Sequence, residues 1–343
     1  MRLHPPAPSR LATSALLLTG ALALTSCAAA SSAEETADSE IVTFALDWAP
    51  NTNHIGLYVA DELGYFADAG VEVDILPYGS AAASQLVAAG EADFGIGGQA
   101  TVQLGRTAGL DVTSVFAVTQ KDVGRLVTDE DISGPAELDG GVFGGFGSPL
   151  YTATAQTVLR GDGGTGEFEE VVLDTGAYEA LHQGRIDFTL SVATWENIQA
   201  ELDGHPYTSF RYQDYGVPEQ QSIGVISSDA YLDAHPGTAE AFTRALQRGY
   251  AYAAEHPDEA ADLLIEANPD SLGGAEELVH RSARMLADDG YLLADGRAVG
   301  EIDPRLWDEF GEFLLDGGFL VDEAGERVTD APDWSRYHRD LLS

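Results

Sequence analysis

The segment IVTFALDWAPNTNHIGLYVADELGYFADAGVEVDIL, residues 41–76, contains the pattern from which the fold class follows. Residues 41–46 are rich in β-forming side chains and predict a strand. Apolar side chains then recur at helical spacing over 56–67, and Gly70 ends this helix. Alternation over 71–76 predicts a second strand. A strand, a helix and a strand of these lengths are typical of a parallel βαβ unit.

The same rhythm continues to about residue 190. We expect helices at 81–89, 150–159 and 178–182 and strands at 94–96, 141–144, 171–173 and 188–190. An internal echo links LVAAGEADF (86–94) with ALHQGRIDF (180–188), because in both a helix ends at a glycine and Asp-Phe opens a strand. Either chance similarity in a chain rich in Ala and Gly, or two lobes built on one plan, explains this echo.

Beyond Asp229 the pattern is almost purely helical. We expect helices at 239–256, 258–267, 275–287 and 304–315, with Pro257, Pro269 and Pro304 at helix starts. The expected fold class is therefore α/β, with two lobes and a helical C-terminal region. Residues 296–343 carry no recognisable motif.

Composition limits the function. At 343 residues the chain is long enough for about two domains. Its 17 Lys and Arg against 57 Asp and Glu give a formal net charge of −40, which repels a nucleic-acid backbone. Lys121 is the only lysine, so a P-loop is absent and Schiff-base chemistry would have to use this residue. We expect no nucleic-acid partner and no nucleotide hydrolysis.

The N-terminus has the pattern of an export signal. Arg2 and Arg10 form a positively charged region before an apolar stretch that runs from Leu11 to Leu24, which predicts a signal peptide over residues 1–26. The string LTSC that follows resembles a bacterial lipobox, which implies lipidation of Cys27, the only cysteine. An ordinary secretory signal with an incidental cysteine is the alternative. Residues 27–40 are expected to form a flexible tether.

Motifs for metal, dinucleotide or nucleophile sites are missing from the sequence, so we expect no cofactor, and nothing requires an enzyme. The candidate site instead follows the first expected strand, where Trp48 precedes the loop Pro50–His54. Ligands of α/β folds bind outside the carboxyl ends of strands. The alternative for Trp48 is a core residue beneath the loop.

Residues 41–268 resemble the substrate-binding lipoproteins of ABC importers that take up pyrimidine precursors of thiamine. Fungal pyrimidine synthases and sulfonate- and nitrate-binding proteins share this superfamily. Four strings carry the resemblance: LDWAPNTNHIGLYVADELGYFADAGVEV (46–73), AAGEADFGIG (88–97), GFGSPLY (145–151) and RALQRGYAYAAEHPDEAADLL (244–264). The resemblance implies a two-lobed periplasmic-binding-protein type II fold with crossover strands near Gln120–Val123 and Ser222–Val225. Lobe 1 would comprise 41–121 and 225–343, and lobe 2 would comprise 122–224.

The departures from the fungal enzymes concern their chemistry. The synthases hold pyridoxal phosphate on a lysine and take ring atoms from a histidine, but Gly97 and Thr101 occupy these positions here. Their cysteine-rich string is also missing, since Cys27 is the only cysteine. We therefore expect a binding protein, and a synthase-like enzyme is the disfavoured alternative.

A pyrimidine precursor is flat and carries an amino group beside a ring nitrogen, so its site needs aromatic rings and hydrogen-bond acceptors. Trp48 is the expected stacking partner. The further aromatic candidates are Tyr58, Tyr151, Trp195 and Tyr215. Glu196 is expected to accept a hydrogen bond from the amino group, and a helix first-turn acid is the alternative.

Polar candidates complete the predicted site. Asn53 and His54 would reach polar ligand atoms, and Asp47 could pair with an amine. Main-chain N–H groups at helix starts are offered by Gly98, Gln99, Gly147 and Ser148. A plain N-cap explains Ser148 equally well, because Pro149 follows it.

The expected function is that of a monomeric, lipid-anchored binding protein on the outer face of the cytoplasmic membrane. It would deliver a pyrimidine precursor of the formylaminopyrimidine or hydroxymethylpyrimidine kind to an ABC permease and its ATPase. Alternative ligands are riboflavin, another aromatic heterocycle or an alkanesulfonate. A surface lipoprotein without a transport role is a further alternative.

Overall fold

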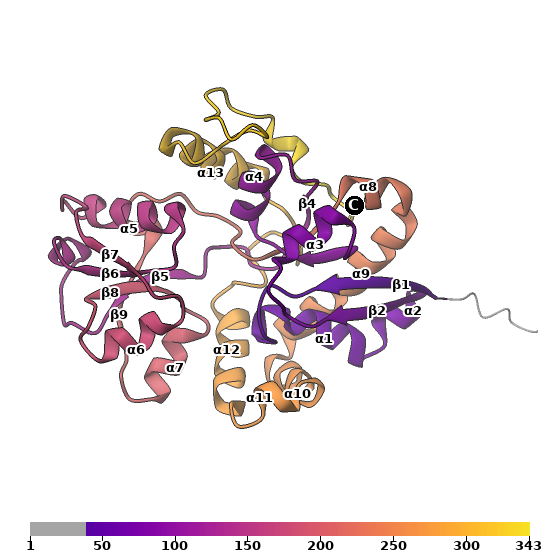
Figure 1. Ribbon diagram of the computed structural model, residues 1–343. Helices are drawn as coiled ribbons and strands as arrows, with labels where there is room; N and C mark the ends of the chain where they lie inside the picture. The colour runs from indigo at the N-terminus through magenta and orange to yellow at the C-terminus, as the bar shows by residue number, and fades with distance from the viewer. Residues whose placement is uncertain (1–38) are drawn as a thin grey trace, which may run out of the picture. The chain divides into compact units, whose positions relative to one another are not determined.

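The computed structural model describes residues 39–343, which contain two separate β-sheets (Figure 1). The first sheet has the order β2-β1-β3-β10-β4, from β1 (Glu40–Ala45), β2 (Val71–Leu76), β3 (Phe94–Ile96), β4 (Thr113–Ala117) and β10 (Gly224–Ser227). The second has the order β7-β6-β8-β5-β9, from β5 (Gly124–Thr128), β6 (Val142–Gly145), β7 (Glu169–Val172), β8 (Phe188–Val192) and β9 (Thr208–Arg211).

The predicted signal peptide, Cys27 and most of the predicted tether lie outside the described residues. Glu40, the last residue of the predicted tether, instead opens β1 and pairs with Val71 of β2.

The two sheets follow one plan. In the first sheet β1 is parallel to β2 and β3, and β10 runs antiparallel to β3 and β4. In the second, β6 is parallel to β7 and β8, and β5 runs antiparallel to β8 and β9. Gly90 and Gly184 of the sequence echo both adopt a left-handed conformation, with φ of 70° and 65°. The echo therefore reflects two lobes of the same design, and chance similarity is the wrong explanation.

The aspartates of the echo also make matching contacts. Asp93 donates its main-chain N–H to the Thr43 carbonyl at 3.0 Å, and its carboxylate accepts from the Thr43 N–H at 2.8 Å. Asp187 donates to the Val142 carbonyl at 2.8 Å and accepts from the Val142 N–H at 2.6 Å. Each aspartate therefore ties the strand that follows it to the neighbouring parallel strand.

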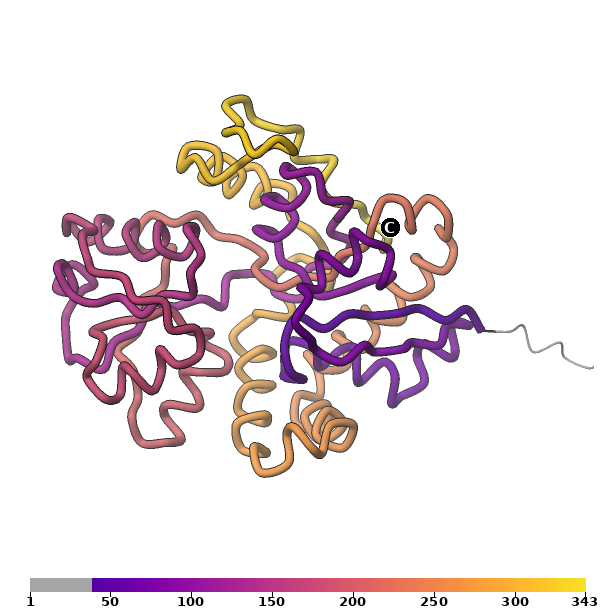
Figure 2. Tube along the Cα trace, viewed as in Figure 1, coloured from indigo at the N-terminus to yellow at the C-terminus, as the bar shows by residue number. Residues whose placement is uncertain are grey.

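The strand directions place the loops that follow the parallel strands. The chain passes from the first sheet to the second over residues 118–123 and returns over 212–223 (Figure 2). Because β5 begins where the first passage ends and is antiparallel to β8, the carboxyl ends of β6 and β8 lie beside the passages. The same reasoning with β4 and β10 places the carboxyl ends of β1 and β3 there. The loops after these four strands therefore face the connections between the sheets.

The helices largely match the sequence pattern. Those of the first βαβ series are α1 (Ile55–Glu62), α2 (Tyr65–Asp68), α3 (Ala83–Ala89) and α4 (Gln99–Thr107), and those of the second sheet are α5 (Pro149–Gly161), α6 (Gly176–His182) and α7 (Glu196–Leu202). The single helix expected over 56–67 is wrong, because Gly64 at φ 71° separates α1 from α2. Short 3-10 turns are η1 (Thr52–His54), η2 (Pro135–Leu138), η3 (Tyr212–Tyr215) and η4 (Trp334–Arg336).

Six helices follow β10. They are α8 (Asp229–Ala234), α9 (Pro236–Glu255), α10 (Pro257–Ala267), α11 (Pro269–Leu272), α12 (Glu276–Asp288) and α13 (Pro304–Gly317), and Pro257, Pro269 and Pro304 are each the first residue of a helix, as expected. The helix α9 packs closely on α1, since a Cβ added at Gly249 would lie 2.0 Å from the Gly56 carbonyl oxygen. This packing fixes the start of α1 and with it the loop after β1.

The segment 296–343 carries no motif but contributes to the core. Trp307, Phe310 and Trp334 are buried in the same hydrophobic cluster as residues of the second sheet. Within the described residues, no helix combines the length and the apolar character that crossing a membrane requires.

Candidate functional site

The loop after β1 presents an aromatic ring to solvent. Trp48 is 48% exposed, and its ring centroid lies 5.1 Å from that of Tyr78. The core interpretation of Trp48 is therefore wrong. Next to it, the Asn51 side chain accepts from the Asn53 N–H at 2.9 Å and caps the turn η1. A half-exposed indole beside a capped turn is available to stack on a flat ligand.

The predicted polar residues of this loop have unequal roles. Both ring nitrogens of the fully buried His54 face groups of the loop: Nδ1 lies 3.4 Å from the Asn51 nitrogen, and Nε2 lies 3.0 Å from Asp47 Oδ1. The prediction that His54 itself reaches the ligand is therefore not supported. Asp47, whose side chain is 42% exposed, keeps a carboxylate oxygen available. The Asn53 amide oxygen is buried and has no hydrogen-bond partner among residues 39–343.

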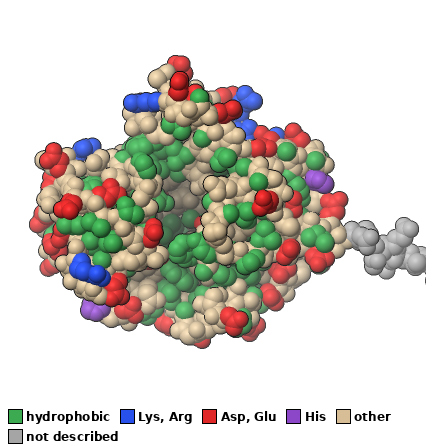
Figure 3. Space-filling view, viewed as in Figure 1, with side chains coloured by type: hydrophobic (Ala, Val, Ile, Leu, Met, Phe, Trp, Pro, Cys, Tyr) green, Lys and Arg blue, Asp and Glu red, His purple; other side chains and the backbone are tan. Residues whose placement is uncertain are grey.

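The loop after β1 forms one wall of the candidate site, and the other wall comes from the second sheet. Tyr151 lies in the first turn of α5, and desolvation raises the pKa of its hydroxyl, with the Asp122 and Asp47 carboxylates adding to the rise. The Tyr151 side chain is 47% exposed, and both carboxylates act on its hydroxyl. They place the hydroxyl within electrostatic reach of the loop after β1. Figure 3 shows a hollow near the centre of the face of the molecule that is turned to the viewer, bordered mainly by hydrophobic side chains.

Glu196 opens α7, directly after the loop that follows β8. Its Oε2 accepts a hydrogen bond from the Val192 N–H at 3.0 Å, which agrees with a first-turn acid. Burial raises the pKa of Glu196, and the Val192 N–H opposes this rise. Burial and the Glu196 charge raise the pKa of Tyr178, and Tyr151 contributes as well. The Phe146 ring lies 6.1 Å from the Tyr151 ring and 6.4 Å from the Tyr178 ring, so both tyrosines pack around one phenylalanine. Oε1 of Glu196 is not used in the contact with Val192.

A buried serine joins the two loops. Ser282 of α12 donates to the Thr194 carbonyl oxygen, so its own oxygen accepts from the hydroxyl of Thr52 in η1. Trp195, which follows Thr194, packs against the hydrophobic core that contains β1 and α1. The loops after β1 and β8 are thus held together by the same helix.

Three further predicted residues are buried in the core, distant from the start of α5 or engaged by the protein. Tyr58 is buried in the hydrophobic core. Tyr215 contacts the C-terminal end of α5, where a Cβ at Gly161 would lie 2.0 Å from the main-chain carbonyl oxygen of Tyr215. This end of α5 is about 18 Å from the start of the helix. The Gln99 amide is used within the protein, because it donates to the Leu306 carbonyl at 2.7 Å and accepts from the Gln221 N–H at 3.1 Å.

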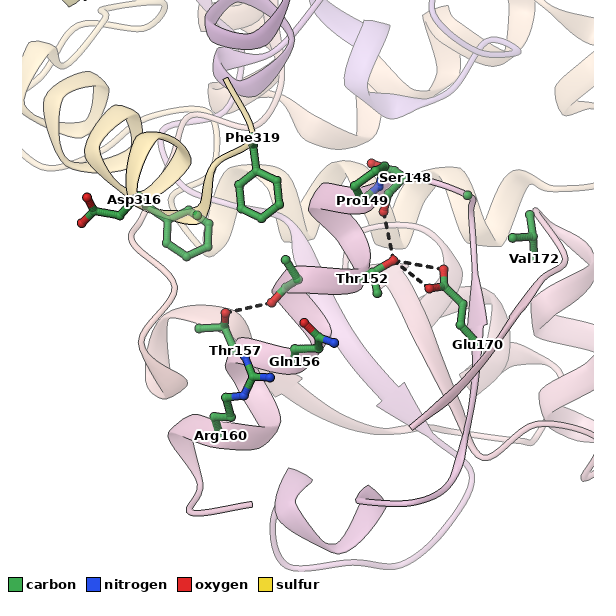
Figure 4. A pocket seen from close by; sticks show the side chains of 14 residues that line it. Ser148, Pro149, Thr152, Gln156, Thr157, Arg160, Glu170, Val172, Asp316 and Phe319 are labelled. Atoms are coloured by element: carbon green, nitrogen blue, oxygen red, sulfur yellow. Dashed lines mark hydrogen bonds between the residues drawn. The ribbon is translucent and has the colours of Figure 1, made fainter. Parts of the chain in front are cut away.

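The predicted glycines and Ser148 have different surroundings. A Cβ at Gly98 would lie 1.8 Å from the Ser222 carbonyl oxygen, so this glycine allows the returning passage to approach. Gly147 and Ser148 line a groove of about 920 Å³ between α5 and the end of α13 (Figure 4). Ser148 is the N-cap residue of α5, but its side chain makes no capping hydrogen bond. The other predicted site residues do not line this groove.

The basic side chains in the first passage and at the start of β5 are engaged by the protein. Lys121 donates to the Asp289 carbonyl at 2.6 Å and lies over the Tyr291 ring. The Arg125 guanidinium donates to the Gly124 carbonyl and to the Tyr291 hydroxyl, both at 2.7 Å. The groups that remain available in the candidate site are therefore aromatic rings, carboxylates and tyrosine hydroxyls.

Sequence reasoning missed Tyr178 and Asp122. Tyr178 lies in the first turn of a helix that follows a strand of the second sheet, and the position of an aromatic residue at that edge was the available signal. Asp122 is buried in the first passage and accepts from the Gln220 side chain at 3.0 Å. Its partner comes from the second passage, which no local pattern indicates.

Two sheets of one plan, joined by two passages of chain, define the fold of a periplasmic binding protein. The alkanesulfonate-binding protein SsuA from Xanthomonas axonopodis pv. citri, solved with bound MOPS, matches this fold with a TM-score of 0.64 at 13% identity. The match covers 84% of this chain and 96% of that protein.

The chain belongs to the NMT1/THI5-like family, whose model matches residues 51–260. It is 34% identical to the formylaminopyrimidine-binding protein of Halalkalibacterium halodurans, over 92% of this chain and 98% of that protein. It is 27% identical to a 4-amino-5-hydroxymethyl-2-methylpyrimidine phosphate synthase of Legionella pneumophila, over 66% of this chain and 74% of that protein. It is 26% identical to the riboflavin-binding protein RibY of Chloroflexus aurantiacus, over 81% of each chain.

Proposed function

We propose that this protein is the extracytoplasmic solute-binding component of an ABC importer. Its ligand is a thiamine pyrimidine precursor of the formylaminopyrimidine or hydroxymethylpyrimidine kind, bound between the two sheets. The ligand of the relative from Halalkalibacterium halodurans supports this choice, because the similarity extends over nearly the whole of both chains.

The observation that carries the proposal is the chemistry of the two walls. Trp48 and Asp47 come from the first sheet, and Tyr151 and Glu196 come from the second. A flat ring can stack on the aromatic side chains, and its amino group can donate to a carboxylate. Each charge-assisted hydrogen bond of this kind contributes about 1.5–3 kcal/mol.

The rival ligands differ in what they require. An alkanesulfonate needs cationic or N–H donors, whereas Lys121 and Arg125 are already engaged. Riboflavin shares the flat heterocycle, and the similarity to RibY keeps it as the second candidate.

The synthase alternative lacks the lysine that would hold the cofactor, because Gly97 occupies the corresponding position. Thr101 likewise replaces the histidine from which the synthases take ring atoms. A role without catalysis is therefore part of the proposal.

Delivery to the importer requires a place at the membrane. We propose that Cys27 is lipidated after removal of residues 1–26 and that the protein stays on the outer face of the cytoplasmic membrane, where a permease and its ATPase take the ligand. Replacement of Cys27 by serine should move the protein from the membrane fraction to the soluble fraction of expressing bacterial cells. Equal membrane retention of both forms would contradict the anchor.

The ligand is tested by thermal unfolding of the purified protein with aminopyrimidines, thiamine, riboflavin, taurine and nitrate. A ligand at a hundred times its Kd adds about 2.7 kcal/mol to the free energy of unfolding. Stabilisation by the aminopyrimidines alone is the expected result. Stabilisation by riboflavin or taurine instead would leave a binding protein with a different ligand. Conversion of an aminopyrimidine into a new product would contradict the non-enzymatic role.

A further inference from the structure

His54 is a buried imidazole with one partner on each ring nitrogen. The Asn51 main-chain nitrogen lies 3.4 Å from Nδ1, and Asp47 Oδ1 lies 3.0 Å from Nε2. A main-chain N–H can only donate, so Nδ1 has to accept this hydrogen bond. The ring proton is therefore on Nε2, which donates it to the Asp47 carboxylate.

The donor is held firmly in place. The Asn51 side chain caps the turn that leads into His54, and the Tyr250 hydroxyl donates to the Asn53 carbonyl at 2.6 Å. Tyr250 is itself fully buried and belongs to α9, which packs on α1. The imidazole is therefore anchored to the core of the first sheet.

Asp47, by contrast, is an exposed loop residue. Among the described residues, the bond from His54 is the only hydrogen bond to its carboxylate, and it engages Oδ1. An exposed aspartate without such a bond would exchange between rotamers. The His54 bond selects one orientation and leaves Oδ2 as a free acceptor.

We infer that His54 is a positioning residue, which holds the Asp47 carboxylate so that Oδ2 accepts a hydrogen bond from the ligand's amino group. The inference rests on the proposed function for the identity of the ligand. His54 makes no contact with the ligand itself, and its role depends on the Nε2–H group that donates to Asp47.

Two variants test the two ring nitrogens of His54 separately. In His54→Gln the side-chain amide reaches the place of Nε2 and can still donate to Asp47, whereas the amide of His54→Asn reaches only the place of Nδ1. The probes are 4-amino-5-hydroxymethyl-2-methylpyrimidine and its analogue without the amino group, measured by calorimetry. We expect His54→Asn to raise the Kd of the amino compound about tenfold or more and His54→Gln to restore most of the affinity. The analogue should bind all forms equally.

Asp47→Asn tests whether the effect passes through the carboxylate. The double variant with His54→Asn should bind the amino compound no more weakly than Asp47→Asn alone. The control is His182→Asn, which removes another histidine–aspartate pair, 2.9 Å from Asp129, at the end of α6 and outside the candidate site. It should leave the Kd unchanged.

A measurement without ligand tests the tautomer. Nitrogen-detected NMR of the imidazoles, with His54 assigned by comparison with His54→Gln, should show a proton on Nε2 and none on Nδ1. A proton on Nδ1, or additive losses in the double variant, would overturn the inference. If the wild-type protein binds an aminopyrimidine and His54→Asn binds it equally well, only the inference is wrong. If the wild type binds no aminopyrimidine, the proposed function is wrong and the inference is overturned with it.

Discussion

Replacement of Glu196 by glutamine should stabilise the empty protein while weakening ligand binding. Burial raises the pKa of Glu196, so its charged form costs stability in the folded state. An acid with a raised folded-state pKa contributes stability below its unfolded value, and this contribution is lost as the pH rises through the folded value. Glutamine removes this dependence and keeps an oxygen that can accept the Val192 N–H.

The effect on binding follows from the type of hydrogen bond. A bond to a carboxylate contributes about 1.5–3 kcal/mol and a neutral bond about 0.5–1.5 kcal/mol. The loss of about 1 kcal/mol corresponds to a Kd about five- to tenfold higher for the aminopyrimidine. Calorimetry gives the Kd. The free energy of unfolding of the empty protein is measured in urea at two pH values, one neutral and one below 4.5, the ordinary pKa of glutamate.

The variant should be more stable than the wild type at neutral pH, and the difference should disappear at the acidic pH. Glu179→Gln is the matched control, because Glu179 also lies in the first turn of a helix of the second sheet but is exposed. It should change neither the Kd nor the free energy of unfolding. An unchanged Kd for Glu196→Gln, or a neutral-pH stability below that of the wild type, would refute the reasoning.

Three further predictions concern the residues around the site. Trp48→Ala should weaken aminopyrimidine binding measured by calorimetry but change the melting temperature of the empty protein little, because the ring is half exposed; a large loss of stability would contradict its role as a stacking surface. Ser282→Ala should cost about 1–3 kcal/mol in urea unfolding, because the Thr194 carbonyl and the Thr52 hydroxyl lose their buried partner. A loss within error would show that these groups find other partners. Gly98→Ala should unfold at a clearly lower urea concentration than the wild type, because its Cβ would lie 1.8 Å from the Ser222 carbonyl oxygen. Gly237→Ala in α9 is the control, because open space surrounds this position, and it should unfold no earlier than the wild type.

The candidate site was predictable to the extent that it depends on local pattern. Trp48 and Glu196 each follow a strand that the sequence indicates, and parallel strands place such residues at one edge of the sheet. The exposure of Trp48 was not predictable, because the same pattern also fits a residue beneath the loop. His54 shows a similar limit, since its neighbours along the chain do not reveal that both of its ring nitrogens face the loop.

Contacts between distant segments account for the errors. Tyr58 lies in the helix that follows the candidate loop, but the packing of α1 on α9 and α10 buries it in the core. Gln99 opens a helix as expected, yet its amide is used by Gln221 and Leu306, which are more than a hundred residues away. A single sequence contains no local signal for such partners.

The amino-acid sequence by itself determined the βαβ rhythm, the division into two lobes and the helical C-terminal region. These features depend on apolar periodicity, on proline at helix starts and on glycine at helix ends, which act over a few residues. Only the tertiary structure decided which polar groups remain free to meet a ligand. Asp47 keeps an oxygen because its side chain is partly exposed and has one partner. The buried Gln99 amide keeps none, because a buried polar group takes whichever partner the packing brings to it, however distant in the chain.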